Sequence, residues 1–589
     1  MVPLVLALTL AGQADWQTHY EKSGFLETGR YQEAIDFCKR LDAASGDAKL
    51  ITYGKSPEGR DMVALIISSE HAFTPGAASK SDRPLIFVQN GIHSGEIEGK
   101  DASLMLARDI LIRRQYPEIL KGANLVIVPV FSVDAHERFS PYNRINQNGP
   151  KDMGWRATAQ NLNLNRDWIK ADGGEMRNEI KLVQAWRPDF LFDNHTTDGA
   201  DYQFTITLAL PMAQTQGAAQ ADWSRKLYGE LKQKLDARGY LTAPYFDLPN
   251  PGDPSTGIVV DDYAPRYSNG YWAAMNRPSV LVETHMLKAY KPRVDSTYWA
   301  MVYTMDRCVE DARALKGMNA ASDAEEKRMG EGSKVVLAAE PTAEKTPFAF
   351  KAWTYTPRES VVSGGRVNAW DTSKPIDVQT TVQDHYRSSV EVELPAAYAV
   401  PPQWKNVQDL LALHGIKGFP VKVSFSTDLA SYRFEDVKFG SMPFESRFMP
   451  NFKAVAITES RTLLPGTMVY PVSQVGAKLL AHMLEPAGPD SLVRWGFFNV
   501  MFEGKEYFED YSMEPIAKQM YDSDPKLRAE FEEKLKDEKF AKNPRARLQF
   551  FYERSPYYDM WLNKYPIARI DTKTLELLRN RELGWRVSR

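Results

Sequence analysis

Two kinds of segment alternate through the first 320 residues, and this alternation limits the fold more than any other feature of the sequence. Short apolar segments rich in β-branched and aromatic residues are typical of strands buried on both faces; they cover residues 61–69, 84–91, 124–132, 189–196, 202–210 and 279–286. Segments with helical spacing lie between them, at residues 99–114, 175–186 and 222–239. The alternation predicts an α/β fold: a mixed, largely parallel twisted sheet with helices on both faces.

The rest of the chain has a different character, so we expect further regions after this domain, which we place at residues 15–320. Residues 321–347 lose apolar periodicity and gain Glu, Lys, Ala and Gly, which favours a linker. Residues 348–470 contain alternating segments that predict a β-rich domain. Residues 471–589 are charged and predict a mainly helical C-terminal region. The predicted fold class is therefore α/β, followed by a β-rich and helical C-terminal part.

Charge and composition exclude several classes of partner. The chain has 589 residues, 43% of them hydrophobic and 25% charged, so a core of normal size can form. The net charge of −3 gives no basic excess for nucleic acid and no acidic tail for a basic partner. No segment approaches the ~20 apolar residues of a membrane span. The sequence predicts no integral membrane segment and no specific protein partner.

The first residues and the cysteines bear on the compartment. Within residues 1–14, positions 3–10 are apolar apart from Thr9 and are followed by the small-residue stretch "AGQA". This pattern is typical of a signal peptide cleaved after Ala14, although no Lys or Arg precedes the apolar run. We therefore expect export to the periplasm or the exterior; a buried first strand or a misassigned start is the alternative. Cys38 and Cys308 belong to no Cys-x-x-Cys pair, which argues against thiolate zinc. They are either free core residues or one disulfide.

Polar side chains stand at the ends of three predicted strands. His93 and Glu96 follow the strand at 84–91, His195 ends the strand at 189–196, and Glu283 lies near the end of the strand at 279–286. In open α/β sheets, sites form beyond the carboxyl ends of the strands, so these groups can converge. Neighbouring glycines leave space around His93 and Glu96.

The residue types at these positions suit a metal. Two imidazoles and one carboxylate are a ligand set for Zn²⁺ that leaves a fourth position open for water. An isolated pair such as His93 and Glu96 more often belongs to a surface loop, so the pair alone does not decide. A carboxylate such as Glu283 in an apolar strand is costly unless it forms an ion pair or acts as a general base.

A polar loop, "MGWRATAQNLNLNRDW", adds candidate substrate contacts. It carries Arg156, Asn165 and Arg166. An arginine fork fits a carboxylate in a bidentate manner. Taken alone, the stretch is equally typical of a surface loop with solvated arginines.

The order of these motifs resembles that of the zinc carboxypeptidases, the carboxypeptidase A-like metallopeptidases. HxxE, Trp-Arg, Asn-Arg after "NLNL", a strand-end His and a later strand-end Glu occur in that family's order, and "YGKSPEGRDMVALIIS" is similar to its upstream motif. The resemblance covers about residues 15–320 and leaves the C-terminal regions outside it.

The resemblance implies a function and a role for each residue. The chain would be a metallocarboxypeptidase that binds one Zn²⁺ per chain and hydrolyses C-terminal peptide bonds with a metal-activated water. The implied roles are zinc ligation by His93, Glu96 and His195, general base catalysis by Glu283, oxyanion stabilisation by Arg156, and binding of the substrate's terminal carboxylate by Asn165 and Arg166.

Two details depart from that family's pattern. The family places a mobile tyrosine some twenty residues before the base, and here Tyr263, Tyr267 and Tyr271 are all candidates. His285 is a rival ligand, two residues along the strand from Glu283. His414 and His482 have no ligand-spaced neighbours, and we expect them to be structural.

Two other functions remain open at this point. A zinc deacylase or amidohydrolase acting on N-acyl amino acids or cell-wall peptides would need the same metal and base. A non-catalytic peptide-binding protein could keep the groove alone.

Overall fold

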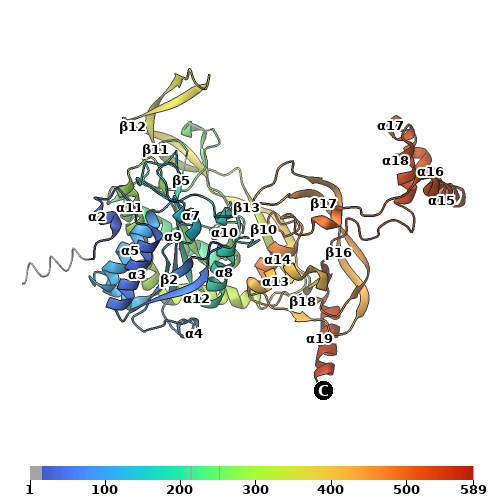
Figure 1. The fold of residues 1–589 in the computed structure, drawn as a ribbon, viewed down its shortest axis with the longest axis horizontal. Coiled ribbons are helices and arrows are strands. Elements are labelled where there is room, and N and C mark those ends of the chain that lie inside the picture. Colours follow the sequence, from blue (N-terminus) through green and yellow to red (C-terminus); the bar gives the residue numbers. More distant parts are fainter. Residues whose placement is uncertain (1–15, 198, 212–214, 251–252, 588–589) are drawn as a thin grey trace, which may run out of the picture.

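The computed structural model describes residues 16–587 apart from 198, 212–214 and 251–252. The expected signal peptide, residues 1–14, lies outside these described residues. The molecule is elongated, with the α/β domain at one end, a β-rich module beside it and a group of short helices at the far end (Figure 1). Here the N-terminal domain means residues 16–326, the C-terminal module means residues 394–509 and 553–587, and the helical group means residues 510–552.

The N-terminal domain is built on an eight-stranded sheet with the order β1-β2-β4-β3-β5-β9-β6-β7. The four central strands, β4, β3, β5 and β9, run parallel, whereas β1, β2 and β6 join the sheet through antiparallel pairs. The strands are β1 (Ala48–Lys55), β2 (Asp61–Ile67), β3 (Leu85–Asn90), β4 (Asn124–Val128), β5 (Phe190–Thr197), β6 (Ile206–Ala209), β7 (Thr242–Pro244) and β9 (Ser279–His285). This sheet confirms the predicted fold class.

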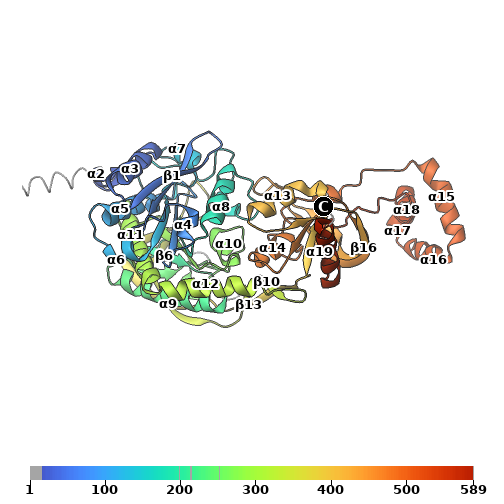
Figure 2. The same cartoon turned by 90° about the horizontal axis from the view of Figure 1, so that it is seen from below.

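Burial explains why the apolar segments became central strands. Every residue of β3, β4 and β5 is buried, as expected for strands covered on both faces. Figure 2 shows α5 and α11 on one side of the sheet and α8 and α10 on the other. The helices and 3₁₀ turns are α2 (His19–Lys22), α3 (Tyr31–Ala44), α4 (Pro75–Ala78), α5 (Glu98–Leu111), α6 (Pro117–Gly122), α7 (Val133–Glu137), η1 (Leu164–Arg166), α8 (Gly174–Trp186), α9 (Ala218–Asp236), η2 (Pro254–Thr256), α10 (Ser268–Ala274), α11 (Tyr290–Glu310) and α12 (Ala312–Glu326).

The stretch expected to be a linker, residues 321–347, contains regular structure. It holds the end of α12 and the strand β10 (Lys334–Pro341), which pairs with β13 (Tyr386–Glu393). Val335 and Leu337 of β10 are buried, which gives this strand pair an apolar face. A long hairpin of β11 (Thr346–Glu359) and β12 (Arg366–Gln383) follows, and β12 also pairs with β8 (Ile258–Val259) of the N-terminal domain.

The C-terminal module contains a six-stranded sheet with the order β15-β18-β14-β19-β16-β17. β19 comes from far along the chain and lies between β14 and β16, so the sheet crosses the boundary expected at residue 470. With three residues, β19 is too short to show the alternation of apolar and polar residues by which a strand is recognised in a sequence, so the sequence did not predict it. The elements are β14 (Ala397–Val400), η3 (Pro402–Trp404), α13 (Lys405–Leu413), β15 (Phe419–Pro420), β16 (Phe425–Phe439), β17 (Pro450–Leu463), β18 (Met468–Pro471), α14 (Ala477–Leu484), η4 (Asn499–Phe502), β19 (Ala568–Ile570) and α19 (Thr572–Val587).

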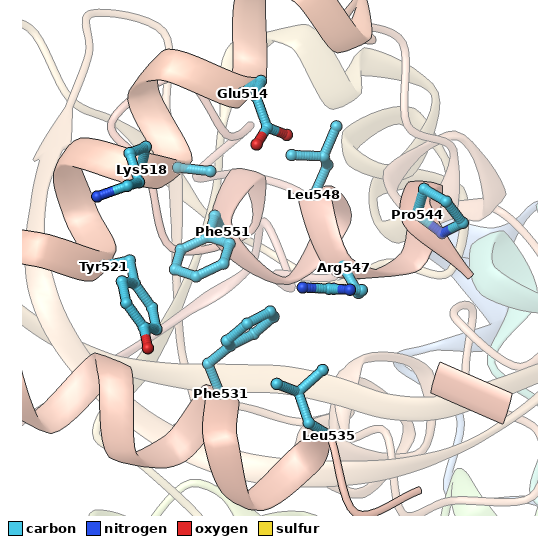
Figure 3. A pocket seen from close by; sticks show the side chains of 10 residues that line it. Glu514, Lys518, Tyr521, Phe531, Leu535, Pro544, Arg547, Leu548 and Phe551 are labelled. Carbon is cyan, nitrogen blue, oxygen red and sulfur yellow. The ribbon is translucent and has the colours of Figure 1, made fainter. Parts of the chain in front are cut away.

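The helical group has an apolar core of its own, separate from the other cores. It consists of α15 (Asp510–Ser523), α16 (Pro525–Lys534), α17 (Glu538–Ala541) and α18 (Pro544–Tyr552). A hollow of about 420 Å³ lies among these helices, where Phe531 and Phe551 face Arg547 (Figure 3). Both views place the group at the opposite end of the molecule from the eight-stranded sheet.

Two questions left open by the sequence have structural answers. Cys38 and Cys308 are buried free thiols, which favours the core alternative over a disulfide. Within the described residues, no helix combines the length and the apolar character needed to cross a membrane.

Candidate metal centre

The centre forms where the central parallel strands end. A tight turn between β3 and α5 carries His93 and Glu96, and the amide N–H of Glu96 donates to the carbonyl of His93 at 2.9 Å. Gly91 begins this turn with φ of +65°, a conformation that glycine adopts without strain. His195 and Glu283 lie near the ends of β5 and β9. Adjacent parallel strands thus bring residues from distant parts of the sequence to one place.

Three side chains offer donor atoms to a single point. His93 Nδ1 and His195 Nδ1 each lie 3.1 Å from Oε2 of Glu96. The three ligand atoms lie within 4.8 Å of one another, and all three residues are buried. Two imidazole nitrogens and one carboxylate oxygen are donors that zinc accepts in open, catalytic sites. The residues present therefore fit a zinc ion.

Hydrogen bonds on the far side of each ring set its tautomer. His93 Nε2 lies 2.9 Å from Oδ1 of Asn163, and His195 Nε2 lies 3.0 Å from Oδ2 of Asp193. Asn163 Oδ1 also accepts from the amide of Asn165, which identifies it as an oxygen. Both Nε2 atoms therefore carry a proton, and both Nδ1 atoms face the metal position.

Burial and neighbouring charges shift the pKa values of the three donors in different directions. Burial lowers the pKa of His93 to about 4, so its ring is neutral near pH 7. Burial alone would lower the pKa of His195 as well, but the carboxylate of Asp193 outweighs it and the pKa lies well above the usual value. Burial raises the pKa of Glu96, whereas His93 and Arg144 lower it by more, so Glu96 is ionised. The centre thus holds a carboxylate ready to neutralise a cation.

Glu283 is the exceptional carboxylate of the site. It lies beside His195 in the strand register, and burial raises its pKa to about 8. Oε2 is buried and has no hydrogen-bond partner among the described residues, and no ion pair involves Glu283 there. The salt-bridge alternative for Glu283 therefore has no structural support. A partly buried carboxylate with an unpaired oxygen beside a ligand cluster is a group placed for proton transfer.

A cavity of about 240 Å³ opens above the donors and contains most of the predicted substrate residues. Arg156 Nη1 lies 3.1 Å from Oε1 of Glu96. Asn165 is held through its Oδ1, which accepts from the amide of Ser268 at 3.0 Å. Arg166 stacks over the ring of Tyr267 at 4.4 Å. The other lining residues are Arg144, Thr196, Thr197, Tyr245, Asp247, Asp261, Tyr263, Asn269 and Leu281.

Two tyrosine candidates line this cavity and the third does not. Tyr263 and Tyr267 contact each other edge to face at its wall. Tyr271 is fully buried on α10, with its hydroxyl 2.8 Å from Nδ1 of His414. Tyr267 precedes α10, whereas Tyr271 lies within this helix, whose residues are all buried. Tyr271 is therefore removed from the substrate candidates.

The remaining histidines do not join the donors. His285 Nε2 lies 3.0 Å from the carbonyl of Ala200, and its ring packs against Tyr202. The rival ligand set with His285 therefore does not form. His414 and His482 are buried in packed surroundings.

Four residues of the site were missed by the sequence argument. Asp193 carried a usable signal, since it precedes His195 by two residues on an apolar strand and so shares its face. Asn163, Arg144 and Tyr245 carried none, because each reaches the site from a loop.

Arg144 also explains the role of Gly95. A Cβ on Gly95 would lie 2.7 Å from Cγ of Arg144, so the glycine makes room for this arginine. Arg144 Nη1 reaches Oε1 of Glu96 at 2.9 Å. Gln147 holds the arrangement, because it accepts from Nε of Arg144 and donates to the carbonyl of Gly95.

Comparisons with known proteins agree with this geometry. Residues 35–237 match the peptidase M14 family, described as zinc carboxypeptidase. Carboxypeptidase 2 of Trichophyton rubrum is 21% identical over 464 residues, which cover 76% of this chain and 79% of the relative. Carboxypeptidase 2 of Trichophyton equinum is 21% identical over 466 residues, with the same coverage.

Among solved structures, a metallo-carboxypeptidase from Burkholderia cenocepacia is 13% identical, with a TM-score of 0.35 over 47% of this chain and 68% of that one. Carboxypeptidase A from Helicoverpa armigera is 16% identical, with a TM-score of 0.33 over 51% of this chain and 75% of that one. The family match includes all three candidate ligands, His93, Glu96 and His195, and ends before Glu283. Residues 35–237, the part of the chain that carries the three candidate metal ligands, are therefore similar to the zinc carboxypeptidases.

Proposed function

We propose that this protein is a zinc-dependent carboxypeptidase that hydrolyses the C-terminal peptide bond of its substrates. The observation that carries the proposal is the meeting of three donors, His93, Glu96 and His195, beside the unpaired carboxylate of Glu283. The family match of residues 35–237 supports the same reaction class.

A zinc ion held by these donors would polarise the scissile carbonyl and lower the pKa of a nearby water molecule. Glu283 then acts as the general base, taking a proton from the attacking water and returning it to the leaving nitrogen. Its pKa of about 8 in the metal-free site follows from burial, and a cation beside it favours the ionised form that a base requires. The strand β9 fixes the direction in which the Glu283 side chain points.

Arginines at the cavity wall are placed for the two negative charges of the reaction. Arg156, on the cavity side of Glu96, is suited to the oxyanion that develops on the carbonyl oxygen. Arg166 and Asn165 lie together in the 3₁₀ turn η1, where a guanidinium fork can hold the free carboxylate of a peptide end. Binding of that carboxylate would restrict cleavage to the last residue.

The test uses one peptide in two forms, with a free and with an amidated C-terminus. Mass spectrometry of the digests is run with the protein as purified, after treatment with a zinc chelator, and after zinc is added back. We expect single C-terminal residues to leave only the free form, and only when zinc is present. Equal cleavage of the amidated peptide would refute exopeptidase action, and hydrolysis of N-acyl amino acids alone would favour the deacylase instead.

We also propose export of the protein, on the strength of its first residues, 1–14. N-terminal sequencing of protein from its own cells should begin at Asp15. A chain that retains Met1 would refute cleavage there.

A further inference from the structure

The hairpin of β16 and β17 ends in a strained turn. Phe444 and Arg447 exchange two backbone hydrogen bonds, of 2.9 and 3.0 Å, around Glu445 and Ser446. Both central residues have positive φ, 46° and 70°, as in a type I′ turn, where Asn-Gly is the usual pair. Non-glycine residues persist in such conformations only where their surroundings hold them. The contacts of Glu445 are therefore candidates for the interactions that hold this turn.

The turn contacts the N-terminal domain at the two ends of a single loop, residues 163–172. Oε2 of Glu445 accepts from the backbone N–H of Asn163 at 2.9 Å. Arg447 makes a bidentate ion pair with Asp172, through Nε at 2.8 Å and Nη2 at 2.5 Å. The loop between these contacts, residues 163–172, carries Asn165 and Arg166 of the cavity. The hairpin tip thus holds the loop where it begins and where it ends.

A single residue, Asn163, links Glu445 to the candidate zinc ligand His93 through hydrogen bonds. Asn163 donates its backbone N–H to the carboxylate of Glu445, and its side-chain Oδ1 lies 2.9 Å from His93 Nε2. A shift of the Asn163 backbone would move Oδ1 and release the ring. The chain of contacts from the hairpin tip to the metal position is therefore short and fully hydrogen-bonded.

A second contact from the C-terminal module leads to the other imidazole. Asp490 is fully buried and accepts from the backbone N–H of Arg266 at 2.8 Å, while its Oδ1 lies 2.7 Å from Nε of the same arginine. Two residues later, Ser268 donates to Asp193 at 2.5 Å, and Asp193 orients His195. Both routes begin at a carboxylate of the C-terminal module, and Asn165 joins them, because it accepts from the amide of Ser268 and donates its own amide to Asn163.

We propose that the C-terminal module is part of the metal centre, and that Glu445 is a positioning residue that orients His93 through Asn163; this rests on the proposed zinc-dependent function. Figure 2 shows the module against the side of the N-terminal domain that carries α8 and α10, where these contacts are made. Outer-shell partners of metal ligands typically change metal affinity by roughly 10–100-fold when removed. Asn163 is such a partner of His93, and the hairpin holds it from outside the domain that carries the ligands.

The experiment compares variants of the full chain. Glu445→Ala removes the acceptor, Glu445→Gln keeps an oxygen that can accept from Asn163, and Glu435→Ala is the matched control on the same hairpin, where Glu435 pairs with Lys453 at the exposed surface. The Kd for zinc is measured by competition with a chelator of known affinity. The thermal unfolding midpoint of each zinc-free protein reports whether the fold is intact.

We expect Glu445→Ala to bind zinc about tenfold more weakly than the parent, within the range for outer-shell partners, with Glu445→Gln and Glu435→Ala close to the parent. The unfolding midpoint of zinc-free Glu445→Ala should match that of the control. Parent-like zinc affinity in Glu445→Ala overturns the positioning role alone. A parent that binds zinc but leaves peptides intact overturns the proposed function alone, and a parent that binds no zinc overturns both.

Discussion

His195 and Glu283 are register partners on the neighbouring parallel strands β5 and β9, so their side chains leave the same face of the sheet. A candidate ligand and the candidate base are thereby held by backbone hydrogen bonds rather than by a loop. His93 and Glu96 complete the donors from the turn after β3, one strand away from β5. The sheet therefore fixes the distance between the metal position and the base.

Replacement of the base should separate metal binding from turnover. Glu283→Gln keeps the size of the side chain and removes the proton acceptor, so we expect zinc to remain bound and kcat to fall by about a thousandfold. Metal analysis and steady-state kinetics on a free-end peptide measure the two effects. Glu310→Gln, at the exposed end of α11, is the control and should behave like the parent. A kcat within tenfold of the parent would mean that another group takes the proton.

Loss of Arg166 should affect binding more than chemistry. Arg166→Ala removes the cation at the cavity wall, and we expect KM for a free-end peptide to rise by about tenfold or more, since charge-assisted bonds to a carboxylate contribute roughly 1.5–3 kcal/mol. kcat should change less. Arg225→Ala, an exposed residue on α9, serves as the control. An unchanged KM would assign recognition of the peptide end to other residues.

The carboxylate behind His195 should tune zinc affinity. Asp193→Asn replaces a carboxyl acceptor by an amide, which makes His195 less basic, so we expect the Kd for zinc to rise roughly 10–100-fold. The pKa of His195 should fall in the zinc-free protein, because Asp193 is what raises it. Histidine NMR titration and chelator competition measure the two. If both values stay at those of the parent, Asp193 has no such role.

Stability should fall with rising pH because of a buried carboxyl group outside the reaction. Glu179 on α8 is fully buried, and burial raises its pKa to about 8. The folded state therefore holds a proton that the unfolded chain releases near the ordinary glutamate pKa of 4.5, so the stabilisation is complete below that value and is lost as pH rises towards 8. The loss from this group is about 1.4 kcal/mol per pH unit at most.

Glu179→Gln should remove this dependence. Thermal unfolding midpoints of the variant should fall less steeply between about pH 5 and 8 than those of the parent. Glu118→Gln, an exposed residue on α6, should leave the slope unchanged. Parallel slopes for parent and Glu179→Gln would show that Glu179 is ionised in the folded protein.

Local patterns in the sequence were sufficient for the sheet and for the residues at its strand ends. Apolar segments predicted the central strands, and the polar residues that follow them, His93, His195 and Glu283, do meet. Arg144 could not be found this way, because the space it fills is defined by Gly95, which lies in another segment. Glu445 lies 282 positions from Asn163, and only the packing of the C-terminal module against the N-terminal domain brings them together.

The position of β19 in the sequence affects when the metal centre can be completed during synthesis. This strand, Ala568–Ile570, sits between β14 and β16, and β16 carries the hairpin whose tip reaches Asn163. During synthesis the ligand-bearing domain leaves the ribosome more than two hundred residues before the strand that anchors that hairpin, since α12 ends at Glu326. A nascent chain would therefore lack the hydrogen bond between Glu445 and Asn163 until translation has passed residue 570, and under our proposal it would bind zinc more weakly before that point.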